Sequence, residues 1–330
     1  MVAMVASVVS ASAVSARAAS AQNCTNPVPS GSPVDLCIKA SDLFAFIVPQ
    51  VGVALAGGNT ILGEGGTLGG WGKRSVTLRL SAVNGTLPAN SVPLTITRSG
   101  ATGDDFGAKR TAVPMPSLDA AIGLFSGIPL GLTNVGGVDA LIGATAIPTV
   151  TSGRLSLKPQ DKAFALSYGV RLGLLQESSL VPGIGLSYMR RRVPTLNVDY
   201  TPNNDTLQVQ NMSLTANAIR AVISKRFLLF GIAAGVGRDE IEGVTGARAV
   251  VNETISGTAQ RAVITLPTLS EKTTRNTAFV NASFGLSIAR IVAEYGRSSA
   301  GSLRQTLNTF GGHQANDAYS YGSVGLTVRF

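Results

Sequence analysis

Apolar and polar residues alternate along many separate stretches of this chain. In the clearest stretch, AFALSYGVRLGLL, Phe164, Leu166 and Tyr168 share one face, whereas Ser167 and Arg171 lie on the other. Alternation with a period of two predicts a β-strand with two unlike faces, because successive side chains point to opposite sides. The same pattern predicts ten strands, at residues 75–83, 117–125, 138–146, 163–175, 183–191, 214–224, 230–237, 277–287, 291–296 and 323–330.

Short and long connections alternate between the predicted strands. This rhythm is typical of an up-and-down barrel, in which tight turns at one end face longer loops at the other. We therefore predict an all-β, up-and-down antiparallel β-barrel of about ten strands, with eight or twelve if PLTITRS forms a further hairpin. We expect long loops at 84–116 and 241–273, and a bulge where the alternation changes phase at Ala218 and Ile219.

The polar face of each predicted strand carries small residues and occasional charges. Hydrophobic residues make up 45% of the chain, charged residues 14%, and the mean hydropathy is +0.27; an ordinary soluble domain has about 25% charged residues. Beyond the N-terminus we find no run of about 18 apolar residues, so we expect no transmembrane helix. The chain would then cross a membrane as a closed ring of strands. The apolar faces would then meet lipid. The predicted lumen-lining residues are Arg79, Asp119, Asp139, Arg171, Asn281, Glu294 and Arg329.

The first residues have the pattern of an export signal. The apolar stretch MVAMVASVVSASAV precedes an Ala-Ser-Ala cleavage site, so residues 1–21 are predicted to be a signal peptide. The alternative is an Ala/Ser-rich tail. We divide the rest into a periplasmic N-terminal segment or plug at 22–71 and an outer-membrane β-barrel at 72–330, and expect localisation in the bacterial outer membrane.

The only two cysteines, Cys24 and Cys37, bracket a segment rich in proline, glycine and serine. A zinc site would need about four ligands, and the only histidine, His313, is distant in sequence. An exported chain meets oxidising conditions, which favour a disulfide between the two cysteines. Two free thiols are the alternative.

The chain ends in an alternating strand, SYGSVGLTVRF. In this stretch Val324, Leu326, Val328 and Phe330 share one face. The pattern resembles the C-terminal signal of Gram-negative outer-membrane β-barrel proteins, although Val328 stands where a tyrosine is common. The resemblance implies that the barrel-assembly machinery recognises these four residues during biogenesis.

A glycine-rich segment, GGNTILGEGGTLGG, precedes the first predicted strand. It is similar to the N-terminal hatch of the long-chain fatty-acid outer-membrane transporter family, although Thr60 follows Asn59 where that family has Asn-Pro-Ala-Gly. This resemblance implies a plug and an apolar ligand. A phosphate-binding loop is excluded, because Thr67 replaces the required glycine and Arg74 replaces the magnesium-binding Ser or Thr.

The sequence offers little for catalysis. His313, with Asp317 four residues later, is the sole candidate base, and a solvated loop histidine is the commoner explanation. We expect no enzyme activity, cofactor or metal. The net charge is +9, but the basic residues are dispersed, which argues against nucleic acid. The cluster Arg190–Arg192 favours contact with lipopolysaccharide phosphates or a solvated rim, and membrane lipid is the other expected partner.

Two functions fit these features. The first is passive passage of small or hydrophobic solutes across the outer membrane, with the N-terminal segment as a partial plug. The second is a closed structural or surface-interaction barrel that binds partners through its long extracellular loops. An enzyme that uses His313 is a third and weaker alternative.

Overall fold

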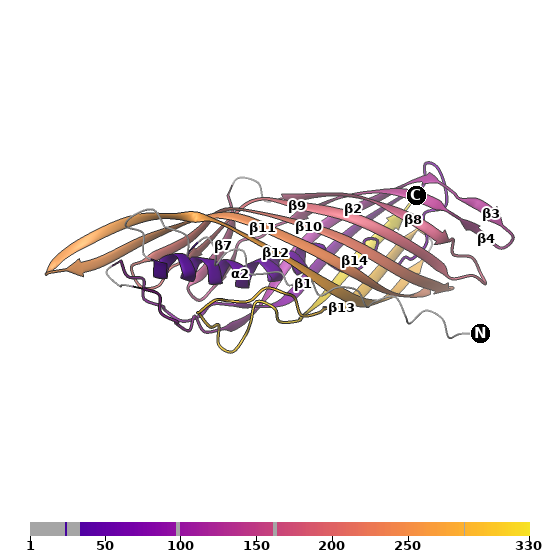
Figure 1. Cartoon of the computed structure of the whole chain (residues 1–330). Helices are drawn as coiled ribbons and strands as arrows, with labels where there is room; N and C mark the ends of the chain where they lie inside the picture. The colour runs from indigo at the N-terminus through magenta and orange to yellow at the C-terminus, as the bar shows by residue number, and fades with distance from the viewer. Residues whose placement is uncertain (1–23, 25–33, 97–99, 161–163, 287) are drawn as a thin grey trace.

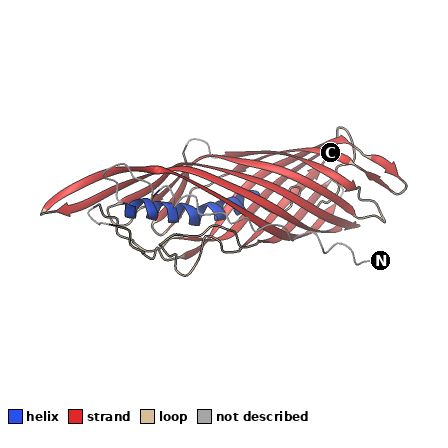
Figure 2. Cartoon of the chain, in the orientation of Figure 1, coloured by secondary structure: helices blue, strands red, loops and turns tan. Residues whose placement is uncertain are grey.

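The computed structural model describes Cys24 and residues 34–96, 100–160, 164–286 and 288–330. Within these residues lie one long helix, α2 (Val34–Ala56), and fourteen strands. Figures 1 and 2 show the strands as an elongated tube, with α2 inside it. The strands are β1 (Arg74–Leu87), β2 (Lys109–Phe125), β3 (Ile128–Leu130), β4 (Thr133–Val135), β5 (Gly137–Ala146), β6 (Val150–Ser152), β7 (Leu155–Pro159), β8 (Phe164–Leu175), β9 (Gly183–Tyr200), β10 (Thr206–Phe227), β11 (Phe230–Ile255), β12 (Thr258–Leu286), β13 (Ala289–Ser298) and β14 (Tyr319–Arg329).

Ten strands of the described chain close into one antiparallel ring. Their order around the ring is β1, β2, β5, β8, β9, β10, β11, β12, β13 and β14, and β14 pairs with β1 to close it. Each of these ten overlaps one of the ten predicted stretches. The predicted all-β, up-and-down barrel of about ten strands is therefore confirmed. The residues of PLTITRS that the structure describes are not in a strand.

The two ends of the ring differ, as the connection lengths predict. At the turn end, where β1 begins and β14 ends, β10 and β11 are joined by Leu228 and Leu229 alone, and the small hairpin β3–β4 lies between β2 and β5. At the opposite, loop end lie the longer connections, including those at 88–108 and 299–318.

Four strands continue far beyond the others at the loop end. The predicted loop at 241–273 is wrong: these residues belong to β11 and β12, which have 26 and 29 residues and meet at a turn at Ser256 and Gly257. The predicted loop at 84–116 is shorter, because β1 and β2 extend into it from either side. We call the extension of β9 to β12, at 192–217 and 241–273, together with β6 and β7, the outer sheet (Figure 1).

The polarity of the ring is inverted relative to a soluble barrel. Leu78, Leu166 and Val280 point outward and are more than half exposed, whereas Thr77 and Ser167 point inward and are buried. Ser, Thr and charged residues occupy the inward positions of most strands. An apolar belt around the outside is the surface that a lipid bilayer covers.

The phase change at Ala218 and Ile219 is not a bulge. The pairing of β10 with β11 runs without interruption through both residues, and the register shifts instead between Gln210 and Ser213. Below this point the apolar residues of β10, such as Ile223, face outward; above it, those such as Leu214 face inward and are buried. The phase change marks the height at which the surroundings of the strand change from lipid to water.

Helix α2 lies inside the ring. It is long and apolar enough by length and composition to cross a membrane, which corrects the expectation that the chain has no such run, but its apolar window is entirely buried. Helix α2 contacts β1, β2, β10, β11, β12 and β14. A helix that is largely apolar and buried along its whole length, with a few charges near its start, suits a position surrounded by protein.

Candidate functional site

The N-terminal segment fills the lumen of the barrel. We call residues 34–71 the plug; nearly all of them are buried. Its first part is α2, and its second part, 57–71, is an irregular segment that leads to β1 at the turn end. The plug therefore runs along the lumen from the loop end to the turn end. The predicted signal peptide at 1–21 lies outside the described residues.

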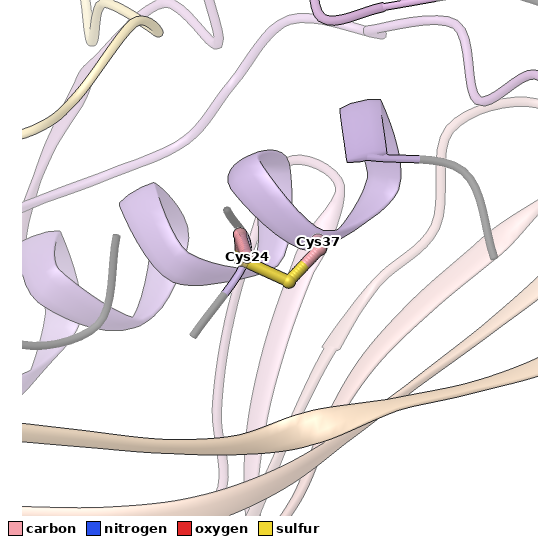
Figure 3. The surroundings of a disulfide bond; sticks show 2 residues. All are labelled: Cys24 and Cys37. Atoms are coloured by element: carbon pink, nitrogen blue, oxygen red, sulfur yellow. A yellow bond between two sulfur atoms is a disulfide. The ribbon is translucent and has the colours of Figure 1, made fainter. Parts of the chain in front are cut away.

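A disulfide joins Cys24 to the first turns of α2. The two Cα atoms of Cys24 and Cys37 are 5.7 Å apart, and both residues are fully buried (Figure 3). The structure thus pairs the two cysteines that the sequence pairs. The bond fastens the chain before α2 to the part of the helix that lies at the loop end.

Charged residues of α2 are bound by two connections at the loop end. Lys39 Nζ contacts Asp35 at 2.7 Å and Asp104 at 2.9 Å, and donates to the carbonyl of Pro93. The Asp42 carboxylate accepts hydrogen bonds from the backbone N–H groups of residues 306–308, the shortest at 2.6 Å. Each buried charge on α2 named here has polar partners, as burial requires. These contacts fix the helix to the connections at 88–108 and 299–318.

One carboxylate in the second part of the plug faces three arginines of the barrel wall. Glu64 is 4% exposed and forms ion pairs with Arg171 and Arg290, each at 3.6 Å, and with Arg329. Arg290 and Arg329 come from the neighbouring strands β13 and β14, whereas Arg171 comes from β8, four strands further around the ring. Glu64 therefore links the plug to several parts of the wall at once.

Further polar contacts continue along the same segment. Arg171 pairs with Asp139 at 2.7 Å, and Asp139 also accepts a hydrogen bond from the Leu68 N–H. Arg79 donates to the carbonyl of Asn59 at 2.7 Å and lies 3.6 Å from Asp119.

A third cluster surrounds Asn59 of the plug. Its backbone N–H donates to Glu294 at 2.7 Å, and its side chain donates to Asn281 at 3.0 Å. Asn281 in turn donates to Glu294 at 2.8 Å.

The structure places all seven residues predicted to line the lumen on the inner side of the wall. Six of them bind the plug directly, and Asp119 lies beside Arg79.

Sequence reasoning missed Arg220 and Glu64. Arg220 is fully buried, donates to the carbonyls of Gly57 and Gly58, and pairs with Asp239 at 2.7 Å. It lies two residues beyond Ala218, where the polarity pattern changes phase. The period of two along β10 places Arg220 on the same face as Ala216 and Ala218, and this signal would have identified it.

Glycines let the plug approach the wall closely. A Cβ atom on Gly65 would lie 2.6 Å from the carbonyl oxygen of Gly183 and 2.8 Å from the backbone nitrogen of Ser224. These are backbone atoms of β9 and β10, which cannot move without disturbing the ring. Only glycine fits at this position of the plug.

The inner face of the outer sheet covers the loop-end part of the plug. Phe46 of α2 stacks on Phe310 with ring centroids 4.1 Å apart, and Phe106 contacts both Phe310 and Tyr200 of β9. Burial raises the pKa of Tyr200 to about 12. Its hydroxyl donates to the carbonyl of Asn90 at 2.6 Å. The lumen is thus covered by an apolar cluster at this end.

His313 and Asp317 lie together in the connection at 299–318. The His313 Nδ1 atom is 3.3 Å from an Asp317 carboxylate oxygen, which also accepts a hydrogen bond from the N–H of Gln314. Both side chains are over a third exposed. This arrangement stabilises a turn, and the absence of enzyme activity stays a prediction.

No known protein family and no curated protein matches this chain. Three solved structures are similar to it: Ail, the attachment invasion locus protein of Yersinia pestis, the transport unit of the autotransporter AIDA-I from Escherichia coli, and a loop-deletion mutant of OmpT, an outer membrane protein of Vibrio cholerae. Their sequence identities are 11%, 10% and 10%, and their TM-scores are 0.22, 0.31 and 0.22. The matches cover 79%, 78% and 78% of this chain and 99%, 90% and 98% of those chains.

Similarity at this level carries no argument about what this chain does. Its own geometry decides the class: a closed ring of strands, apolar outside and polar inside. The chain is an outer-membrane β-barrel. The resemblance to the fatty-acid transporter family and the recognition of the C-terminal residues during assembly both stay hypotheses.

Proposed function

We propose that this protein is a closed outer-membrane barrel that acts as a surface-interaction protein through its outer sheet. The observation that carries the proposal is the length of β9 to β12. On β11, all of which the structure describes, the continuous apolar belt ends at Val236, beyond which Val244 is the one exposed large apolar residue, yet the strand continues to Ile255, roughly 60 Å further along the strand. A strand that only crosses a membrane needs about 9–11 residues.

The orientation follows from the connections. Outer-membrane barrels have short periplasmic turns and long extracellular loops, so the turn end faces the periplasm and the loop end faces outward. The outer sheet then projects from the cell surface. The plug supports a closed state, because it occupies the lumen and is bound at both ends.

We also propose lipopolysaccharide as a partner of the barrel at the upper edge of its belt. Arg190, Arg192 and Arg238 lie next to the last outward apolar residues and are partly or fully exposed. Arginine binds phosphate oxygens in a bidentate manner. These side chains are therefore well placed for the phosphates at the surface of the outer leaflet.

The test compares the full chain with a trimmed chain in which residues 247–266 are replaced by an Asn-Gly turn. Bacteria that display each form are assayed for attachment to immobilised glycans and to one another. We expect attachment by the full chain and at least a tenfold loss on trimming, with equal amounts of folded barrel. Equal attachment by both forms, or ion conductance by the unmodified chain in planar bilayers, contradicts the proposal.

A second function, passage of solutes after displacement of the plug, is favoured by one observation. Residues 57–71 contact the wall through many ion pairs and hydrogen bonds, which can exchange with water, and through a small apolar cluster in which Ile61 and Leu68 meet the wall. Deletion of residues 40–70 tests this function in planar bilayers. Conductance or uptake of apolar solutes that rises on deletion supports a plugged passage, and silence from both forms rules it out.

A further inference from the structure

A polar groove lies on the outward face of the outer sheet. It crosses β10, β11 and β12 and has a volume of about 460 Å³. Val250 forms the middle of its floor, paired with Thr206 on one side and Val263 on the other. Arg248 lies on one side of this middle row, and Arg261, opposite Asn252, lies on the other. The groove thus has a small apolar centre between two cations.

Neither arginine of the groove is neutralised by a neighbour. Within the described chain, Arg248 and Arg261 have no hydrogen-bond or ion-pair partner for their side chains. Among the described residues, two carboxylates near this face, those of Asp199 and Asp205, form no ion pair with either arginine. Asp199 pairs with Lys158 at 3.1 Å and accepts from Gln208, and Asp205 accepts from the N–H of Asn252 at 2.8 Å.

The spacing of the two arginines suits two separate acidic groups. Arg248 and Asn252 are four residues apart on β11, and Arg261 is one strand away on β12, so their Cα atoms lie about 14 Å apart. This distance is too long for both guanidinium groups to share one small anion without bending across Val250. A ligand with two acidic groups, one for each arginine, fits the arrangement.

The other donors favour a carbohydrate over a peptide. The three strands are fully paired with one another across the groove, so no backbone edge is available for an extended peptide. The lining is instead made of carboxamide and hydroxyl side chains, including those of Asn204, Thr206 and Asn252. Such groups both donate and accept hydrogen bonds, as sugar hydroxyls do.

The groove is also far from the lipid surface. Arg248 is ten residues beyond Arg238, which lies at the edge of the apolar belt, or roughly 30 Å further along β11. A phosphate at the bilayer surface would meet Arg238 rather than Arg248. The ligand is therefore in the aqueous layer outside the membrane.

We propose that this groove is a binding site for an oligosaccharide that carries at least two acidic groups, with Arg248 and Arg261 each binding one of them. The site rests on the proposed function, because it lies on the surface that the outer sheet presents. Asn204, Thr206 and Asn252 bind hydroxyl groups of the sugar rings between the two acidic groups.

The experiment measures binding of soluble probes to the purified full chain in detergent. The probes are tetragalacturonate and a heparin tetrasaccharide, with neutral maltotetraose and tetraglutamate as comparisons. We expect at least one acidic oligosaccharide to bind ten times or more tightly than maltotetraose and tetraglutamate. Arg248→Gln and Arg261→Gln should each weaken this binding about tenfold. Arg297→Gln, an exposed arginine of β13 outside the groove, should bind like the wild type.

Each contrary result has one meaning. Equal binding of tetraglutamate overturns the carbohydrate assignment, and an equal loss in Arg297→Gln shows only unspecific charge attraction. No binding of either acidic probe, or wild-type binding by both groove variants, overturns the site. If the trimmed chain still loses surface attachment in those cases, the outer sheet remains an interaction surface and only the groove is eliminated. Vesicles of lipopolysaccharide without distal sugars should not compete with the soluble probe; competition places the ligand at the membrane instead.

Discussion

Single residues decide how tightly the plug is held, and Glu64 is the clearest case. It is the one carboxylate of the described plug segment 57–71, and it compensates three arginines. Glu64→Gln leaves these buried cations without that partner, which typically costs about 3–5 kcal/mol. We expect a lower unfolding temperature, measured as loss of the fast-migrating folded band on a detergent gel. Glu240→Gln removes an exposed ion pair with Lys272 and should change stability by less than about 1 kcal/mol.

We expect the stability of the loop end to depend on pH through Asp105, which lies in the connection at 88–108. A hydrogen bond from the Gly311 N–H is the main cause that lowers its pKa, and the Gly107 N–H and Thr309 hydroxyl contribute. A lowered pKa in the folded state means that these contacts stabilise the loops at neutral pH. The stabilisation declines below the ordinary pKa of 3.8 and is lost as the pH falls through the folded value. The protection of the Gly311 amide against exchange, relative to an unfolded chain at the same pH, should fall over this range, and Asp105→Asn should abolish this dependence.

The sequence predicts correctly on which side of a strand a residue lies where the outside of the strand meets only lipid or only water. Leu166 and Val280 face lipid, so local alternation identifies them. It fails on β11 above Val236, because Ile241, Ala249 and Val251 are apolar but face inward, whereas Ile232 faces outward. The apolar face of β11 changes from the outward to the inward side along the strand. The alternation is interrupted at this point, so the sequence pattern predicts that the strand ends there. This change explains both the wrong loop at 241–273 and the wrong bulge at Ala218.

At the scale of elements, the partners of the plug could not be predicted from the sequence. The glycine-rich segment suggests a plug, but Glu64 meets Arg329 only because the ring brings β8, β13 and β14 around it. Helix α2 was missed, since Lys39, Asp42 and Pro49 interrupt its apolar run. These charges are tolerated because the connections at the loop end supply their partners.

We expect reduction of the disulfide to affect α2 without unfolding the barrel. Cys24 and Cys37 are 13 residues apart, and closing a loop of this length contributes about 3 kcal/mol in the chain-entropy account. We expect mass spectrometry of the exported, non-reduced protein to show one peptide pair that joins the two cysteines. Reduction should loosen the start of α2 while the barrel keeps its folded gel migration. Two alkylatable thiols in the exported protein would contradict the pairing.

The outer hairpin is predicted to be dispensable for the ring. Residues 247–266 pair mainly with one another and with the upper part of β10, and none of them is in the belt. The trimmed chain should therefore fold and migrate as a barrel, with a lower midpoint of unfolding because the buried side chains of Ala247, Ala249, Val251 and Leu266 are lost from the core. Failure of the trimmed chain to fold in detergent would show that the outer sheet is part of the folding unit.

The whole molecule depends on a seam that the last residue helps to close. The Phe330 N–H donates to the Arg74 carbonyl at 2.9 Å, and its own carbonyl accepts from the Arg74 N–H at 3.2 Å. Its side chain is 72% exposed, so packing within the chain does not explain an aromatic residue here. Val324, Leu326 and Val328 lie on the same strand and pair across the seam with Leu80, Leu78 and Val76.

Deletion of Phe330 separates a role in assembly from a role in stability. The loss of two backbone hydrogen bonds at an end of the seam should cost only about 1–3 kcal/mol in protein refolded in detergent. If the assembly machinery reads this residue, the amount of barrel in the outer membrane should fall much further, by about tenfold. Phe330→Ala keeps the backbone bonds and should show the same defect in cells with almost wild-type stability in detergent. Wild-type levels of the truncated chain in the membrane would leave Phe330 as a structural end of β14 and nothing more.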